Sequence, residues 1–311
     1  TTSTINFTAV NDAPVAAAST LTTIAEDVAD ASNPGTLVSA LVANFTDGDA
    51  GAVKGLAVTA VDTTNGTWQY STDAGVGWAT LTGVSTTAAR LLKGDDANYK
   101  VRFVPNANYN GTATLTYQAW DQTSGTAGAT ADVTVNGGST AFSSNTGTAT
   151  ITVTAVNDAP VNTVPGAQTV AEDTGLTFTG GNAISVNDVE GNLATTRLTV
   201  TQGTLTVTLG TPGATIGPGA NNSATLTLAG TQTQINAALA TLTYQGVLNF
   251  NGSDTLTVLS TDALGATDTD TVAITVTTVN DVPVNTVPGA QSVAEDTVLA
   301  FSGAAAISAA D

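Results

Sequence analysis

The sequence predicts an all-β protein made of tandem β-sandwich domains joined end to end, with one short helix in the second whole domain. Two observations predict it: strand-like alternation and a phrase that recurs at domain-sized intervals. Val-Asn-Asp-Ala-Pro begins at Val10 and at Val156, and Val-Asn-Asp-Val-Pro begins at Val279. Intervals of roughly 100–150 residues are ordinary domain lengths, so each repeat is expected to have its own core.

The recurring phrase sets the expected domain boundaries. Similarity is strongest after it, since Pro160–Gln168 returns unchanged as Pro283–Gln291. We expect a closing strand, two whole sandwich repeats and the opening strands of a further repeat, at residues 1–10, 11–157, 158–280 and 281–311. Two explanations remain open. The chain is either a window from a longer repetitive polypeptide or a polymer subunit whose incomplete ends complement each other.

The strands are predicted from period-2 alternation of Thr with apolar residues. It is clear in Thr148–Thr154, Leu198–Leu209 and Thr271–Thr277. Thr112–Trp120 and Asp254–Ser260 occupy matching positions in their repeats. Thr and Val suit a pleated, half-buried surface and disfavour long helices.

Tight turns precede two of these strands. Asn110-Gly111 and Asn251-Gly252 supply residues that tolerate positive φ. The aromatic ring just before each turn, Tyr109 or Phe250, is expected to pack inward.

One segment follows a helical period instead. Ile235, Leu239 and Leu242 recur at i, i+4 and i+7 within residues 233–242, and Thr231 or Thr233 is the expected N-cap. A short helix is therefore predicted to cross one end of the second sandwich.

Composition excludes several classes of function. The chain of 311 residues contains no His, Cys or Met. This removes Ser-His-Asp and Cys-His catalytic arrangements, ordinary zinc sites and disulfides. No apolar run approaches the roughly 18 residues of a membrane span, and no signal-peptide pattern opens the chain. A mean hydropathy of +0.17 argues against disorder.

Charge is strongly unbalanced, with 25 Asp and Glu against 6 Lys and Arg and a net charge of −19. Side chains therefore cannot neutralise most carboxylates. Such a charge repels nucleic acid and anionic lipid, so neither is expected as a partner. A solvated acidic surface is the simplest interpretation of part of this excess.

The remaining acids fall at strand ends, where a sandwich gathers its loops. Each repeat carries an Ala-Glu-Asp near its first strand, an acidic turn, an acid after its penultimate strand and the junction Asn-Asp. The acidic turns contain Asp47-Gly-Asp49 and Asp188-Val-Glu190.

Taken in this order, the motifs resemble the cadherin superfamily, specifically the cadherin-like tandem repeats of giant bacterial surface adhesins of the RTX/VCBS type. Val-Asn-Asp-Ala-Pro is similar to the cadherin linker motif, Glu172 to its first-strand Glu and Asp47-Gly-Asp49 to its Asp-x-Asp turn. The resemblance covers both whole repeats. It implies Greek-key sandwiches of the cadherin or immunoglobulin type, and a secreted protein at the cell surface.

The resemblance also implies Ca²⁺ between successive domains. For the preceding junction the implied ligands are Asn11, Asp12, Asp47, Asp49 and Asp121. For the junction between the two whole repeats they are Glu26, Asn157, Asp158, Asp188, Glu190 and Asp262. For the following junction they are Glu172, Asn280, Asp281 and Asp311. Calcium takes six to eight oxygen ligands, with affinities of about 10⁻⁴–10⁻³ M in extracellular modules.

This sequence departs from the family pattern at three points. Thr8, Thr154 and Thr277 replace the leading Asp of the linker, no Asp-Arg-Glu motif is present, and Glu190 replaces an Asp. We therefore expect fewer ions per junction than in animal cadherins. Bare, flexible junctions are the alternative. With calcium, the implied function is a stiff, non-enzymatic adhesin rod whose partners are the neighbouring repeats of the same chain.

The sequence suggests three rival functions. A self-assembling filament or surface-layer subunit, whose partners are copies of itself, is the main alternative. A glycosidase needs two carboxylates about 5–10 Å apart, but the acids here occupy junction positions. Trp68 and Trp78 suggest either a carbohydrate-binding patch or, as we favour, the packing of a hairpin.

Overall fold

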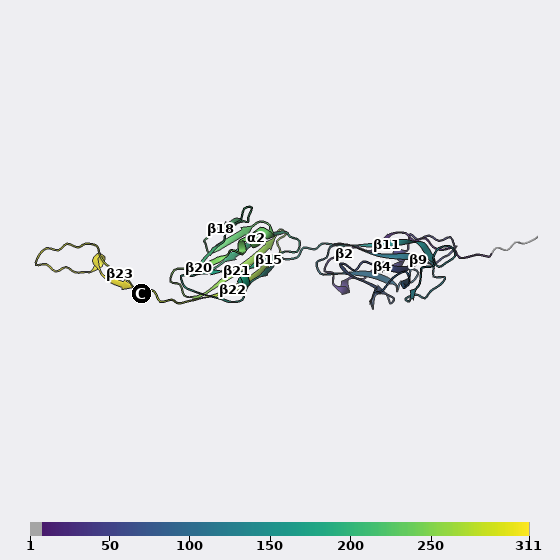
Figure 1. Cartoon of the computed structure of the whole chain (residues 1–311), viewed down its shortest axis with the longest axis horizontal. Helices are drawn as coiled ribbons and strands as arrows, with labels where there is room; N and C mark the ends of the chain where they lie inside the picture. Colours follow the sequence, from purple (N-terminus) through teal and green to yellow (C-terminus); the bar gives the residue numbers. More distant parts are fainter. Residues whose placement is uncertain (1–7, 311) are drawn as a thin grey trace, which may run out of the picture. The chain divides into compact units, whose positions relative to one another are not determined.

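The computed structural model describes residues 8–310, and the chain divides into two compact units, Thr1–Val156 and Asn157–Asp311. Most of the expected closing strand, residues 1–7, lies outside the described residues, and so does Asp311. Both units are β-sandwiches with few helices, which confirms the predicted all-β tandem fold (Figure 1).

The larger sheet of unit 1 has seven strands. Its order is β1-β11-β9-β4-β7-β10, and β2 also pairs with β11. The strands are β1 (Ser19–Thr20), β2 (Ile24–Ala25), β4 (Gly55–Val61), β7 (Ala89–Lys93), β9 (Gly111–Trp120), β10 (Thr130–Ala131) and β11 (Phe142–Thr154).

The smaller sheet of unit 1 has the order β3-β8-β5-β6. Its strands are β3 (Thr36–Leu37), β5 (Gly66–Ser71), β6 (Ala79–Thr80) and β8 (Lys100–Pro105). Leu56 and Tyr117 from one sheet and Trp68 and Phe103 from the other belong to one buried cluster. The two sheets therefore enclose a common core.

Unit 1 also contains a helical turn that the sequence did not predict, α1 (Val38–Leu41), after the short 3₁₀ turn η1 (Asp30–Ser32). Val38 and Leu41 are both buried. Four residues are too few to display a helical period, and this is why the pattern gave no signal.

Unit 2 repeats the two-sheet plan with different strand lengths. The larger sheet, in the order β13-β22-β21-β16-β19-β18, contains β13 (Gln168–Ala171), β16 (Leu193–Thr199), β18 (Thr215–Gly219), β19 (Thr225–Ala229), β21 (Gly252–Asp262) and β22 (Thr267–Thr277). The smaller sheet, β14-β20-β17, contains β14 (Gly175–Thr177), β17 (Gly203–Thr206) and β20 (Thr243–Gly246). A separate pair is formed by β12 (Val161–Thr163) and β15 (Ser185–Asn187), with η2 (Gly180–Asn182) before β15.

The predicted helix of unit 2 is α2 (Gln232–Leu239). It begins one residue before the expected start because Thr231 caps it: the Thr231 hydroxyl accepts from the backbone N–H of Gln234, whose side chain accepts from Thr231 in return. Ile235 and Leu239 pack into the core. Leu242, although buried, lies beyond the helix end.

The prediction of a single strand over Leu198–Leu209 is wrong, because two strands, β16 and β17, share this range. At residues 200–202 the chain turns and passes from β16 in the larger sheet to β17 in the smaller sheet. The turn is held because Asp254 accepts hydrogen bonds from the backbone N–H groups of Thr201 and Gln202, at 3.0 and 2.9 Å. The alternation also changes phase at this turn: the apolar residues are Leu198 and Val200 before it and Leu205, Val207 and Leu209 after it.

In unit 1, β1 and β2 run parallel to β11, and in unit 2, β13 runs parallel to β22. Ala25 pairs with Thr154, and Ala171 pairs with Thr277. Because paired parallel strands end at the same edge, the next residues, Glu26 and Glu172, lie where the chain leaves each unit.

The two expected inward rings lie against the cores. Tyr109 packs against the core of unit 1 and Phe250 against that of unit 2. Each Asn-Gly turn holds its Gly at positive φ, 140° at Gly111 and 137° at Gly252.

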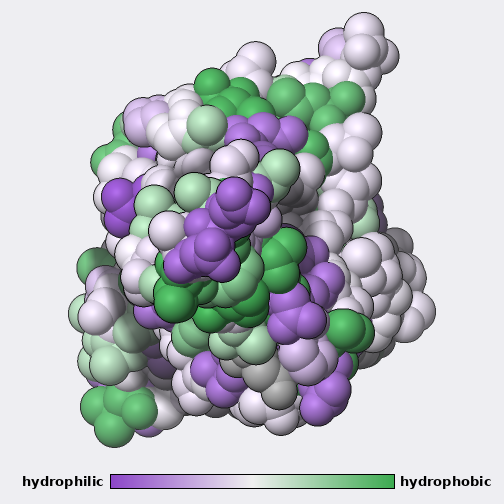
Figure 2. Space-filling view, turned by 90° about the vertical axis from the view of Figure 1, so that its left-hand side faces the viewer, coloured by the Kyte–Doolittle hydropathy of each residue, from purple (hydrophilic) through white to green (hydrophobic). Residues whose placement is uncertain are grey.

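After residue 280 the chain forms a small hairpin, with β23 (Val284–Thr286) paired to β24 (Ser308–Ala310) and η3 (Gly303–Ala305) between them. It repeats the β12–β15 pair of unit 2. Large hydrophobic residues of this segment are exposed, among them Val282, Val298 and Phe301. Figure 2 shows hydrophobic residues interspersed with hydrophilic ones on the molecular surface.

Candidate metal-binding carboxylates

At the start of unit 1, hydrogen bonds gather four of the candidate ligands. The Asn11 amide donates to Asp121 Oδ2 at 2.8 Å, and the backbone N–H of Asp12 donates to Asp49 Oδ2 at 2.8 Å. Asp121 is buried at the end of β9, where its Oδ1 accepts the N–H and hydroxyl of Thr123. The linker Asn-Asp is therefore tied to two strand-end acids.

The acidic turn is shaped by Asp47 and Gly48. The backbone N–H of Asp49 donates to Asp47 Oδ1 at 2.8 Å, which closes the turn. A Cβ at Gly48 would lie 2.8 Å from Asp12 Oδ2, so this glycine makes room for the Asp12 carboxylate. Asp47 Oδ2 is buried without a hydrogen-bond partner among the described residues. A cation is one group that would satisfy it.

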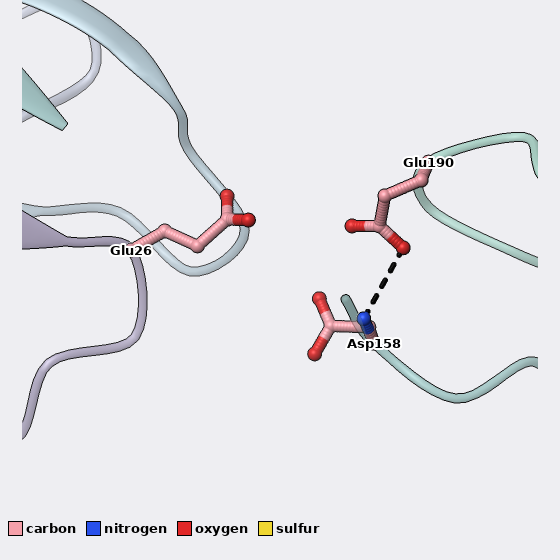
Figure 3. A group of neighbouring side chains, drawn as sticks. All are labelled: Glu26, Asp158 and Glu190. Carbon is pink, nitrogen blue, oxygen red and sulfur yellow. Dashed lines mark hydrogen bonds between the residues drawn. The ribbon is translucent and has the colours of Figure 1, made fainter. Parts of the chain in front are cut away.

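Unit 2 repeats this arrangement at its own start. The Asn157 amide donates to Asp262 Oδ2 at 2.6 Å. The backbone N–H of Asp158 donates to Glu190 Oε2 at 3.3 Å, the contact drawn in Figure 3. Asp188 is buried, and its Oδ1 accepts the backbone N–H of Asn192 at 2.9 Å.

Hydrogen bonding keeps Asp262 ionised. The bond from Asn157, with further bonds from the backbone N–H groups of Ala266 and Leu264, holds the pKa of Asp262 below its ordinary value, although burial acts in the opposite direction. An ionised carboxylate with a fixed orientation is suited to bind a hard cation.

At the opposite end of each unit stands a buried glutamate. Glu26 Oε1 accepts the backbone N–H of Val156 at 2.7 Å, and Oε2 accepts the Asn110 amide at 3.2 Å. In unit 2, Glu172 makes the same bonds to Val279 and Asn251, at 2.6 and 3.4 Å. Each glutamate therefore fastens the residue that immediately precedes a junction Asn-Asp.

Hydrogen bonds from the Asn-Gly turns to the Glu-Asp pairs of the two units were not predicted from the sequence. Besides the amide bonds above, the backbone N–H of Asn108 donates to Asp27 Oδ1 at 3.1 Å, and that of Asn249 donates to Asp173 Oδ1 at 2.9 Å. The signal was present in the sequence, because one Asn-aromatic-Asn-Gly turn follows the Ala-Glu-Asp in each whole repeat.

The last set of implied ligands is not gathered in the same way. Asn280 and Asp281 are exposed, and the Asn280 amide donates to the carbonyl of Asp281 at 3.0 Å. Asp311 falls outside the described residues.

Within either unit, no three carboxylates of residues 8–310 come within 4.8 Å of one another. Among residues 8–310, an ion pair forms between Arg102 Nη2 and Asp30 Oδ2, which are 3.8 Å apart. Neither residue is a candidate ligand. Because calcium takes six to eight oxygen ligands, the carboxylates of one unit alone would fill only part of such a coordination shell.

Comparisons with known proteins give a family match to part of the chain only. The family model for the Protein GAMETE EXPRESSED 2 domain matches residues 181–271. No curated protein sequence matches the chain.

Solved structures with a similar arrangement include mouse cadherin-23 EC22-24, with 16% identity over 87% of this chain and 65% of that one, at a TM-score of 0.38. Human CDH23 EC21-23 has 13% identity over 96% and 79% of the two chains, at 0.44. Protocadherin Gamma B2 extracellular cadherin domains 3-6 have 16% identity over 86% and 53%, at 0.36. The chain thus spans just under two thirds of the mouse structure and about half of the protocadherin structure. In residues 8–310, no helix has the length and apolar character needed to cross a membrane.

Proposed function

We propose that this chain is a non-enzymatic segment of an extracellular adhesive rod, displayed on a bacterial surface, whose junctions are stiffened by calcium. The observation that carries the proposal is the hydrogen bonding of two consecutive linker residues. Val156 is bonded to Glu26 of unit 1, and Asn157 is bonded to Asp262 of unit 2.

Covalent geometry makes this arrangement significant. The Cα atoms of Val156 and Asn157 are about 3.8 Å apart across their peptide bond. The bond from the backbone N–H of Val156 to Glu26 is 2.7 Å long, and the bond from the side-chain amide of Asn157 to Asp262 is 2.6 Å long, so each of two consecutive linker residues is bonded to a carboxylate of its own unit.

Carboxylates bonded to consecutive linker residues would repel one another in the absence of a cation. At this junction the residues proposed to hold calcium are Glu26, Asn157, Asp158, Asp188, Glu190 and Asp262. Bound Ca²⁺ would remove the repulsion and restrict the hinge, since its ligands would belong to successive units. At the preceding junction, calcium would be held in the same way by Asn11, Asp12, Asp47, Asp49 and Asp121.

A calorimetric titration of the full chain with CaCl₂ tests this proposal. Glu26→Gln keeps the size of the side chain but removes its charge, and we expect it to weaken calcium binding by about tenfold or more. Glu295→Gln is the matched control, because Glu295 occupies the same Ala-Glu-Asp phrase but is exposed in the C-terminal segment. Equal calcium binding by the wild type and Glu26→Gln would exclude Glu26 as a ligand. No binding at millimolar calcium would exclude the calcium junction.

A filament or surface-layer subunit is a second candidate, favoured by the exposed C-terminal segment. Val170, Phe178 and Ile184 are 9%, 0% and 2% exposed in unit 2, whereas their counterparts Val293, Phe301 and Ile307 are 51%, 50% and 58% exposed. Hydrophobic surface of this kind favours association. Sedimentation velocity distinguishes the candidates: a filament subunit forms oligomers as concentration rises, and Phe301→Ser reduces them. A segment that contacts only its own chain stays monomeric.

A further inference from the structure

Unit 1 contains a polar pocket that the proposed rod function does not use. The pocket has a volume of about 500 Å³. Its lining includes three partly buried aromatic residues and three small or acidic ones: Tyr70, Trp78, Tyr99, Ser71, Asp73 and Gly128.

One wall of this pocket belongs to the sandwich, and the other is an addition to it. One wall is the β5–β6 hairpin, and another is the segment between β9 and β11, residues 121–141. In unit 2 the corresponding connection, between β21 and β22, is residues 263–266 only. The longer connection is anchored by its own buried cluster, which includes Trp120, Val133 and Phe142. The pocket is therefore a built feature of unit 1 and not a consequence of the shared fold.

Two arginines hold the aromatic rings of the pocket in place. The Arg102 guanidinium lies 4.3 Å from the centre of the Trp78 ring, and that of Arg90 lies 5.0 Å from the centre of the Tyr70 ring. Arg90 also donates to the carbonyl of Gly128 at 2.6 Å, which ties the two walls together. Rings fixed in advance lose little conformational entropy when a ligand stacks on them.

The polar groups of the pocket are fixed as well. Asp73 Oδ1 accepts the Ser71 hydroxyl at 2.7 Å and the backbone N–H of Gly77 at 2.8 Å. The bond from Gly77 has the largest effect, and together with the bond from Ser71 it holds the pKa of Asp73 below its ordinary value. The carboxylate is therefore ionised at neutral pH. Its Oδ2 lies beside Gly77, where a Cβ would come within 2.9 Å. An ionised carboxylate of this kind is a strong acceptor for hydroxyl groups.

We propose that this pocket binds a neutral saccharide. Apolar C–H faces of a sugar stack on aromatic rings, while its hydroxyl groups need fixed acceptors, and the pocket offers both. A cationic ligand is disfavoured, because the positive guanidinium groups of Arg90 and Arg102 lie beside the Tyr70 and Trp78 rings and would repel it. An anionic saccharide is disfavoured by Asp73 and by the net charge of −19.

Nuclear magnetic resonance of the full chain tests the assignment. The probes are maltopentaose, cellopentaose and triacetylchitotriose as neutral saccharides, with a galacturonic acid oligomer and choline as charged comparisons. We expect at least one neutral probe, at millimolar concentration, to shift the amide signals of Gly77 and Gly128, and neither charged probe to do so. Absence of shifts with all three neutral probes, or shifts with choline, would overturn the proposal.

Two variants locate the binding site. Trp78→Ala is expected to weaken binding of the neutral probe by about tenfold, the loss of one good aromatic contact. Asp73→Asn, which keeps the shape of the side chain, is expected to weaken binding even if Trp78→Ala disturbs the hairpin. The control is Val76→Ala, because Val76 belongs to the same hairpin and is 89% exposed. Unchanged affinity in both Trp78→Ala and Asp73→Asn would place the saccharide elsewhere and refute the assignment.

Discussion

Asp254 is a buried carboxylate on which the turn between β16 and β17 depends. Its Oδ1 accepts the backbone N–H and the hydroxyl of Thr201, at 3.0 and 2.8 Å, and the backbone N–H of Thr255 at 2.8 Å. Its Oδ2 accepts the backbone N–H of Gln202 at 2.9 Å and the hydroxyl of Tyr244 at 3.0 Å. Burial raises the pKa of Asp254, but the bonds from Thr201, Gln202 and Thr255 together hold it below the ordinary 3.8.

We predict that Asp254→Asn destabilises unit 2. With the amide oxygen in the Oδ1 position, three bonds survive without charge assistance, but the amide NH₂ group then faces the Gln202 N–H, which loses its acceptor. One orphaned buried donor costs about 1–3 kcal/mol, and the weakened bonds raise the total to roughly 2–5 kcal/mol. For a unit of this size, that lowers the melting temperature by roughly 4–20 °C.

Differential scanning calorimetry of the full chain measures this change in melting temperature. The amide signals of unit 2 in nuclear magnetic resonance spectra show when that unit unfolds. Asp270→Asn is the control, because it removes one charge from the same unit and is expected to change stability by less than about 0.5 kcal/mol. Because the folded pKa of Asp254 lies below the unfolded value, its stabilisation is complete above the ordinary 3.8 and is lost as pH falls through the folded pKa. The difference between wild type and Asp254→Asn should therefore shrink at acid pH. Equal melting at neutral pH, or a difference independent of pH, would refute the reasoning.

Two further predictions concern unit 2. Thr231→Ala removes the capping box of α2 and should destabilise the unit by about 1 kcal/mol. Thr233→Ala, an exposed change within the helix, is the control in denaturant titrations. Gly203→Ala places a Cβ 2.5 Å from the ring of buried Tyr244, an overpacking that should cost about 1–3 kcal/mol by thermal unfolding. Gly181→Ala meets no atom within 4 Å and should be neutral or slightly stabilising, so equal losses in both glycine variants would contradict the packing argument.

The fold could be predicted where the signal was local and repeated. Alternation identified β9, β11, β21 and β22, because each of these strands has one face in a core and one face outside it. The turn at residues 200–202 was missed, although the alternation changes phase at Gln202-Gly203, and the residue that holds this turn, Asp254, is distant in the sequence. The helical turn α1 was too short to show a period.

The candidate ligands could be named from the order of motifs, but their bonding could not. The sequence does not show that Glu26 contacts Val156, since this follows from the parallel pairing of β2 with β11. Nor does it distinguish Trp68, which is buried in the core, from Trp78, which lines a pocket. The Glu26–Val156 contact and the surroundings of the two tryptophans depend on the pairing of strands that are distant in the sequence. A single sequence shows no pattern from which such pairing can be predicted.

Small-angle X-ray scattering of residues 1–281, with calcium and then with chelator, tests the calcium-stiffened junction most directly. With a dissociation constant of about 10⁻⁴–10⁻³ M, calcium at roughly 10 mM would stabilise each site by about 1.4–2.7 kcal/mol. The predicted result is a narrower distribution of interdomain distances with calcium, reversed by chelator and absent in Glu26→Gln. Identical scattering curves in calcium and in chelator would contradict the account and leave these carboxylates as a solvated acidic surface.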